Sequence, residues 1–276
     1  MSTEEESVDP ADPRALPLAH FGQEVRLERE RLGISRRELG AEAHASYALV
    51  AKIEAGERVP RLEFAEACDR LFPDAHGRFV RLSRLVVRFA FPPWFRKYVE
   101  LEERAEAIRM YHCQLVPGLL QTEAYARAIM AAGRYANAEN YVTARMERQR
   151  ILASEAPPHL WVILDEGVLR RVVGSREVMK EQLERLKGIA ETPQHVIQVI
   201  PEDGRPYNGS CGPFGLLSFS DEPDALYVDG YPRGYVLGDR ADVAGGAHSY
   251  DLLRADALSP EESALLIDAI LKEEYS

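Results

Sequence analysis

The segment from Ser35 to Gly56 constrains the fold most, because it predicts two short helices joined by a tight turn. Ser35, followed three residues later by Glu38, is a capping-box pattern in which the two side chains satisfy free N–H groups at a helix start. Ser46 is in the right place to cap the second helix. His44 stands in the turn, where we expect a positive φ that is uncommon outside glycine. Apolar residues recur on one side of each helix, which predicts a small helical core and an outward face.

Helices are also predicted on both sides of this pair. Gly33 ends the preceding helix, because glycine takes a positive φ at little cost. The helical pattern continues well beyond the pair, and we therefore assign residues 18–75 to one all-helical domain. An arginine-rich and apolar stretch at 76–92 predicts a connecting helix, which Pro92 and Pro93 interrupt.

The remaining residues, 93–276, predict a second domain that mixes strands and helices. Short runs rich in β-forming residues predict four strands, at 160–164, 196–200, 214–219 and 225–228. A capped amphipathic helix at 175–191 lies between the first two, and this order indicates an α/β layer. Further helices are expected at 94–110, 123–132, 138–154, 242–257 and 260–274. The predicted fold class is α+β and multidomain, with an all-α N-terminal domain and a mixed α/β C-terminal domain.

Charge is unevenly distributed along the chain. The net charge is −11, but residues 21–100 hold 15 basic and 12 acidic side chains. Residues 101–276 hold 18 basic and 28 acidic side chains, which suits a partner or a regulatory role. Residues 1–17 are polar and acidic with three prolines, which predicts a disordered tail. The block 21–100, which contains the helix pair, is thus the net-positive part of the chain. A small local positive balance can support phosphate contacts even on an acidic protein, since exposed charges beyond about 10 Å are screened at physiological salt.

A helix pair of this kind can hold its second helix in the major groove of DNA, where each base pair shows a distinct edge. Residues at the start of the first helix and after the second helix are placed to contact phosphates. They are Ser35, Arg36, Arg37, Arg58 and Arg61. Residues on the outward face of the second helix are placed to meet base edges. They are Ser46, Tyr47, Ala48 and Lys52. We expect a homodimer, because one recognition helix gives little affinity and a two-fold site doubles the contacts.

Two stretches, LGISRREL at 32–39 and VAKIEAGERVP at 50–60, resemble the Xre (Cro/repressor) helix-turn-helix family. The resemblance implies a regulator that binds double-stranded DNA, and it implies that Glu54 is structural and ties the recognition helix to the core. Tyr47 stands where the family often has glutamine, and Ala48 offers only apolar contact. Readout of DNA shape therefore gains weight over direct readout of bases. The alternative is a helix-turn-helix fold reused for dimerisation.

Residues 94–108 and 115–127 resemble the conserved domain of unknown function that follows an Xre module in actinobacterial Scr-type, antitoxin-like regulators. The resemblance extends through 225–229 and 258–263. It implies control of transcription, often with a small partner protein encoded nearby, and it implies no enzyme activity. Two alternatives stay open: a small-molecule-sensing repressor, and an antitoxin-like protein-interaction module with little DNA role.

The sequence lacks the common motifs for catalysis, cofactor binding and metal binding. It has no Gly-x-Ser-x-Gly, no P-loop and no His-Glu-x-x-His. Its three cysteines are far apart and form no Cys-x-x-Cys pair, so neither a zinc site nor a disulfide framework is indicated. No apolar run approaches the roughly 20 residues that span a bilayer, and the acidic start is not a secretory signal. We expect no catalytic residue, no cofactor, no metal and no membrane contact, in a cytoplasmic, nucleoid-associated protein.

Overall fold

The computed structural model describes residues 15–135, 137–203 and 212–275. Contacts divide this described chain into two compact units. The first unit holds the residues up to Pro93 together with Gly133–Arg148, and the second holds Trp94–Ala132 and the residues from Gln149 onward. The disordered tail predicted at 1–17 lies outside the described residues, except for its last three residues, which begin helix α1.

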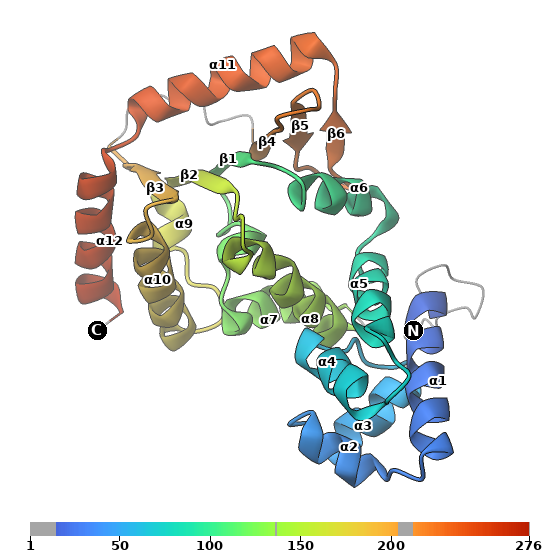
Figure 1. The fold of residues 1–276 in the computed structure, drawn as a ribbon. Helices are drawn as coiled ribbons and strands as arrows, with labels where there is room; N and C mark the ends of the chain where they lie inside the picture. Colours follow the sequence, from blue (N-terminus) through green and yellow to red (C-terminus); the bar gives the residue numbers. More distant parts are fainter. Residues whose placement is uncertain (1–14, 136, 204–211, 276) are drawn as a thin grey trace, which may run out of the picture. The chain divides into compact units, whose positions relative to one another are not determined.

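The first unit is all-helical in its described part, as the sequence predicts (Figure 1). Its helices are α1 (Ala15–Arg31), α2 (Arg36–Glu42), α3 (Tyr47–Glu54), α4 (Leu62–Leu71), α5 (Arg78–Ala90) and α8 (Ala138–Arg148). Three buried rings meet in its core: Phe79 lies edge-on to Phe21 at 5.9 Å and to Phe72 at 5.2 Å between ring centroids. The helix predicted at 76–92 is α5, which packs against α1 and α4.

Helix α8 packs in the first unit, although its sequence lies far beyond the predicted boundary at residue 93. It contacts α5, and its residues Val142 and Ala144 are buried. The guanidinium carbon of Arg148, its last residue, lies 6.0 Å from the ring centroid of Phe91. The two units are therefore not divided at a single position in the sequence, because residues 133–148 belong to the first unit and complete its helical core.

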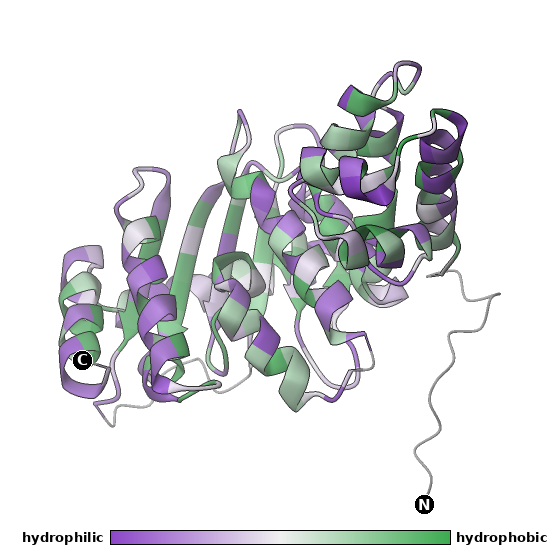
Figure 2. Cartoon of the chain, turned by 90° about the horizontal axis from the view of Figure 1, so that it is seen from below, coloured by the Kyte–Doolittle hydropathy of each residue, from purple (hydrophilic) through white to green (hydrophobic). Residues whose placement is uncertain are grey.

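Among the described residues, the second unit is built on a mixed six-stranded sheet in the order β3-β2-β1-β4-β5-β6. The strands are β1 (Ala107–His112), β2 (His159–Asp165), β3 (His195–Ile200), β4 (Phe214–Ser218), β5 (Ala225–Val228) and β6 (Tyr235–Leu237). The first three strands are parallel, with Ile108 opposite Leu160 and Leu160 opposite His195. The other three continue the sheet in antiparallel fashion. Most of the strands are green in Figure 2, in keeping with an apolar sheet.

Helices cover both faces of this sheet (Figure 1). They are α6 (Pro93–Glu102), α7 (Glu123–Ala132), α9 (Glu166–Arg170), α10 (Arg176–Ala190), α11 (Arg240–Asp256) and α12 (Pro260–Glu274), with short 3-10 helices at Gly118–Leu120 and Gln149–Ala153. Alternate residues of a strand point to opposite faces. Leu160 and Val162 of β2 share a buried cluster with residues of α10 and α12. Ile163 shares another with Tyr250 and Leu253 of α11. The sheet is therefore the middle layer of the unit.

The fold class is confirmed, and the sequence located most of the elements of the second unit. All four predicted strands are present, and β2, α10 and β3 form the predicted strand–helix–strand layer. The helix predicted at 94–110 is wrong in its second half, because α6 ends at Glu102 and strand β1 follows. Strand β6 was not predicted either. Leu101, Ala105 and Ile108 recur at i, i+4 and i+7, which is typical of one helix face and explains the wrong prediction. Pairing with β2 and β4 makes residues 107–112 the strand β1 instead.

No helix in the described part of the chain is both long and apolar enough to cross a membrane. Within the same described residues, no group of three or more His, Cys, Asp or Glu side chains is arranged to hold a metal ion.

Gln182 of α10 is fully buried and joins α10 to the segment that leads into α7. Its Nε2 donates to the carbonyl oxygen of Leu120 at 2.8 Å, and its Oε1 accepts from the N–H of Thr122 at 2.8 Å. Replacing Gln182 by methionine keeps the volume but removes both hydrogen bonds. We expect the free energy of unfolding of the second unit to fall by about 2 kcal/mol. Denaturation followed by tryptophan fluorescence measures this, since Trp94 and Trp161 both lie in the second unit.

The matched control for this prediction is Gln114→Met, because Gln114 is exposed. It should change the free energy of unfolding by less than about 0.5 kcal/mol. Equal losses in the two variants would show that the buried hydrogen bonds of Gln182 do not stabilise the unit.

Candidate nucleic-acid interface

Helices α2 and α3 form a two-helix motif with the caps that the sequence predicts. The N–H of Glu38 donates to Ser35 Oγ at 3.2 Å, and the N–H of Ser35 donates to Glu38 Oε2 at 2.7 Å. The side chain of Ser46 caps α3. His44 in the turn has a φ of +48°, and Gly33, predicted to end the preceding helix, has a φ of +67°. The local conformation of the motif is confirmed.

Gly40 lets α2 approach the turn closely. A Cβ atom at this position would lie 2.4 Å from the carbonyl oxygen of Ala45, closer than real side chains come. The N–H of Ala45 donates to the carbonyl oxygen of Gly40 at 2.8 Å. Leu39, Val50 and Ile53 are buried on the inner side of the two helices. Backbone contact and an apolar core thus fix α3 against α2, and the opposite side of α3 faces outward.

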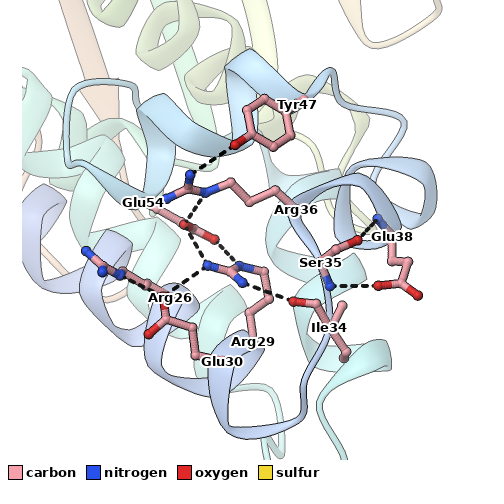
Figure 3. A network of polar contacts seen from close by, with 9 residues as sticks. All are labelled: Arg26, Arg29, Glu30, Ile34, Ser35, Arg36, Glu38, Tyr47 and Glu54. Carbon is pink, nitrogen blue, oxygen red and sulfur yellow. Dashed lines mark hydrogen bonds and ion pairs between the residues drawn. The ribbon is translucent and has the colours of Figure 1, made fainter.

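Glu54, at the C-terminal end of α3, is a buried carboxylate held by two arginines (Figure 3). Only 1% of its side chain is exposed. Arg29 of α1 donates from Nε to Oε1 and from Nη2 to Oε2, the latter at 3.2 Å. Arg36 of α2 donates from Nε to Oε2 at 2.7 Å. Three helices therefore meet at one carboxylate, which confirms the structural role expected for Glu54.

This network also orients the first residue of α3. A hydrogen bond to Glu54 raises the pKa of Arg29, and hydrogen bonds to Glu54 and then to Tyr47 raise the pKa of Arg36, so both guanidinium groups stay charged. Arg36 Nη1 donates to Tyr47 Oη at 3.4 Å, and its guanidinium carbon lies 5.8 Å from the centroid of the tyrosine ring. Figure 3 shows the resulting chain of contacts from the buried carboxylate to the exposed ring.

The outward face of α3 carries the side chains predicted to meet base edges. All four are exposed: Ser46, Tyr47, Ala48 and Lys52. Tyr47 keeps 54% of its surface accessible. Arg37, at the start of α2, and Arg61, just before α4, are also exposed. The face therefore offers a lysine ammonium, two hydroxyl groups and a methyl group, with exposed arginines at the ends of the neighbouring helices.

Two of the arginines predicted to contact phosphates are engaged within the protein instead. Arg36 belongs to the Glu54 network, with 30% of its side chain exposed. Arg58 Nη2 donates to Glu139 Oε2 of α8 at 3.0 Å, with 21% of its side chain exposed. Ser35 uses its Oγ and its N–H in the capping box. A phosphate contact by either arginine would have to compete with an existing carboxylate partner.

Residues at the start of α8 border the recognition helix, and the sequence did not place them there. Asn140 Oδ1 accepts from the N–H of Val59, and its Nδ2 donates to the carbonyl oxygen of Glu57, both at 3.0 Å. A groove is lined on one side by residues of α3 that include Lys52, and on the other by residues 137–140. Val59 and Asn140 are 81 positions apart, and no local pattern signals such a contact.

Two family models match the chain. Residues 20–72 match a model described as a helix-turn-helix domain, and residues 95–269 match one described as a domain of unknown function, DUF5753. Neither the curated proteins nor the solved structures contain a match to the chain. The first matched range contains α2, α3 and every residue predicted to face DNA. The second contains α8, which packs in the helical unit.

Proposed function

Because the chain belongs to the DUF5753 family and carries a helix-turn-helix domain, we propose that it is a sequence-specific transcription regulator that binds double-stranded DNA through α3. The observation that carries this proposal is the exposed outer face of α3, held in place by the buried Glu54 network. The helix pair also lies within the block 21–100, which holds 15 basic and 12 acidic side chains and owes its positive balance mainly to the arginines of α5. That charge supports the phosphate contacts on which DNA affinity depends.

The side chains on α3 suggest how DNA would be read. Lys52 can donate to guanine, and Ala48 can contact a thymine methyl group. Tyr47 presents a hydroxyl group and an aromatic face to the groove. Arg37 and Arg61 are the exposed cations placed for phosphates. Because the face has few donors, we expect DNA shape to contribute a large share of specificity.

The finer parts of the proposal rest on resemblance and on charge. We propose an Xre-type regulator that acts as a homodimer in the cytoplasm, bound to the nucleoid, with no enzyme activity. Its acidic second unit would carry dimerisation and control, with a small partner protein encoded nearby as the input. Small-molecule sensing and an antitoxin-like interaction module are the alternative roles. Recovery of only the chain itself in a pull-down from its host would count against the partner.

The first test is fluorescence anisotropy of the purified full-length protein on the DNA directly upstream of its own gene. A scrambled duplex of the same base composition is measured in parallel. Both duplexes are titrated at salt concentrations from about 50 to about 200 mM, because affinity that comes from phosphate contacts falls steeply over this range. We expect tighter, salt-sensitive binding to the upstream duplex. Lys52→Ala should weaken that binding roughly tenfold and reduce the preference for the upstream duplex.

Arg37→Ala separates phosphate contact from base readout. It should weaken binding to both duplexes alike and lower the slope of log affinity against log salt by about 1. Lys180→Ala, which removes an exposed lysine of α10, is the control and should leave both affinities unchanged. Equal binding to the two duplexes, unaffected by Lys52→Ala, would contradict readout by α3. It would favour the interaction module.

A further inference from the structure

The start of α8 is attached to the turn that follows the recognition helix. Arg58 pairs with Glu139 at 3.0 Å, and Asn140 bonds the backbone on both sides of Arg58, at Glu57 and Val59. All these residues belong to the first unit, so the contacts lie within one compact body. One polar side chain satisfying two backbone groups, next to an ion pair, defines a specific docking geometry rather than a chance surface contact.

This attachment places a carboxylate where DNA would need a cation. The turn after α3 is where Arg58 was expected to hold a phosphate, and Glu139 now accepts a hydrogen bond from that guanidinium. The adjoining groove contains Lys52 and Arg58, but also Glu57 and Glu139, so its formal charges cancel. A phosphate oxygen and the Glu139 carboxylate are competing acceptors for the same N–H groups, and two anions at one site repel each other.

The chain path links this attachment to the rest of the DUF5753 region. Residues 133–148 enter the first unit directly after α7 and leave it directly before the 3-10 helix at Gln149–Ala153, and both of these elements belong to the second unit. A change in the second unit that pulls on either end of this segment would therefore act on α8. The ion pair is exposed enough to open, because 45% of the Glu139 side chain is accessible.

We propose that the Arg58–Glu139 pair is a latch, which DNA must open to bind, and that Glu139 thereby sets the DNA affinity of the helix-turn-helix domain. The inference rests on the proposed function. DNA phosphate replaces Glu139 as the acceptor for Arg58, and α8 is the segment through which the DUF5753 region lowers or raises affinity. The occupant of the opened site is a phosphate of the DNA backbone, so the latch acts on all DNA sequences alike.

The test uses the full-length protein and a fluorescein-labelled duplex of random sequence. The duplex is about 30 base pairs long, which is enough for two half-sites one helical turn apart. Four variants are compared with the wild type across a salt series: Glu139→Gln, Glu57→Gln, Arg58→Ala, and Arg58→Ala with Glu139→Gln. Glu139→Gln should bind about fivefold more tightly, with a salt slope steeper by about 1, because one more phosphate contact forms. Glu57→Gln removes the same charge from the same groove and should change affinity less than twofold, roughly the effect of a screened charge.

The double variant decides whether the effect passes through Arg58. In the Arg58→Ala background, Glu139→Gln should lose its advantage and resemble Glu57→Gln. Three results would overturn the latch: no gain for Glu139→Gln, equal gains for Glu139→Gln and Glu57→Gln, or a gain that persists without Arg58. If the wild type binds the duplex, each of these results contradicts the latch and leaves the regulator proposal standing. If neither the wild type nor any variant binds this duplex or the upstream duplex, both proposals fail.

Discussion

Replacing Glu54 by alanine should lower the free energy of unfolding of the helical unit by about 3–5 kcal/mol, because breaking a buried ion pair leaves uncompensated charge. Arg29, with only 10% of its side chain exposed, would lose both hydrogen bonds to Glu54 and keep the longer contact to the exposed Glu30, at 3.4 Å. Arg36 would lose the partner that holds it beside Tyr47. The substitution also removes the side chain that joins α1, α2 and α3. The free energy of unfolding therefore falls through lost packing between these helices as well as through the unpaired charge.

Hydrogen exchange followed by mass spectrometry on peptides from residues 20–72 measures this loss where it should occur. Glu57→Ala is the matched control, since Glu57 is an exposed carboxylate three positions along the chain. It should shift the free energy of unfolding by no more than about 0.5 kcal/mol. A Glu54→Ala protein as stable as this control would show that the buried carboxylate is not needed for the fold.

The same substitution should weaken DNA binding even under conditions in which the protein stays folded. Without Glu54, Arg36 is free to move away from Tyr47, and the tyrosine ring loses its fixed position at the start of α3. Glu54→Gln keeps the shape and the hydrogen-bond acceptor of the side chain, so its effects should fall between those of wild type and alanine. If both the stability and the DNA affinity fall in the order wild type, Glu54→Gln, Glu54→Ala, then both properties depend on the Glu54 carboxylate.

The sequence was most informative where structure depends on near neighbours. Ser35 with Glu38, Ser46 and the positive φ of His44 were all predicted, because a cap or a turn is decided within about four residues. The strands β2 to β5 were predicted from short apolar runs for a related reason. A buried strand needs β-forming side chains whatever its partners are.

Features that depend on distant partners were not predictable in the same way. Strand β1 lies between a parallel and an antiparallel neighbour, and neither is close in sequence. The placement of α8 in the first unit and the pairing of Arg58 with Glu139 depend on residues 81 positions apart. A single sequence carries no local signal for such contacts, and an arginine destined for an ion pair looks the same as one free to bind phosphate.

Phe79→Ala should be comparably damaging to the helical unit, by about 3–5 kcal/mol, because it deletes a fully buried ring from a close-packed core. Phe79 is the ring that both Phe21 and Phe72 contact edge-on, so its removal takes away two aromatic pairs at once. The backbone is not affected directly. The N–H groups of Phe79 and Val80 donate to the Asp69 carboxylate at 3.0 and 2.9 Å, and alanine keeps both hydrogen bonds.

Leu85→Ala on the same helix is the control, since 46% of Leu85 is exposed and its truncation leaves no enclosed cavity. It should cost less than about 1 kcal/mol. Hydrogen exchange of α1, α4 and α5 should report the loss in the Phe79 variant, because these three helices surround the ring. Similar exchange in the two variants would contradict the prediction, because it would mean that the Phe79 ring contributes no more to the stability of the helical unit than the exposed Leu85 side chain. A large difference would place the stability of the helical unit in this aromatic centre.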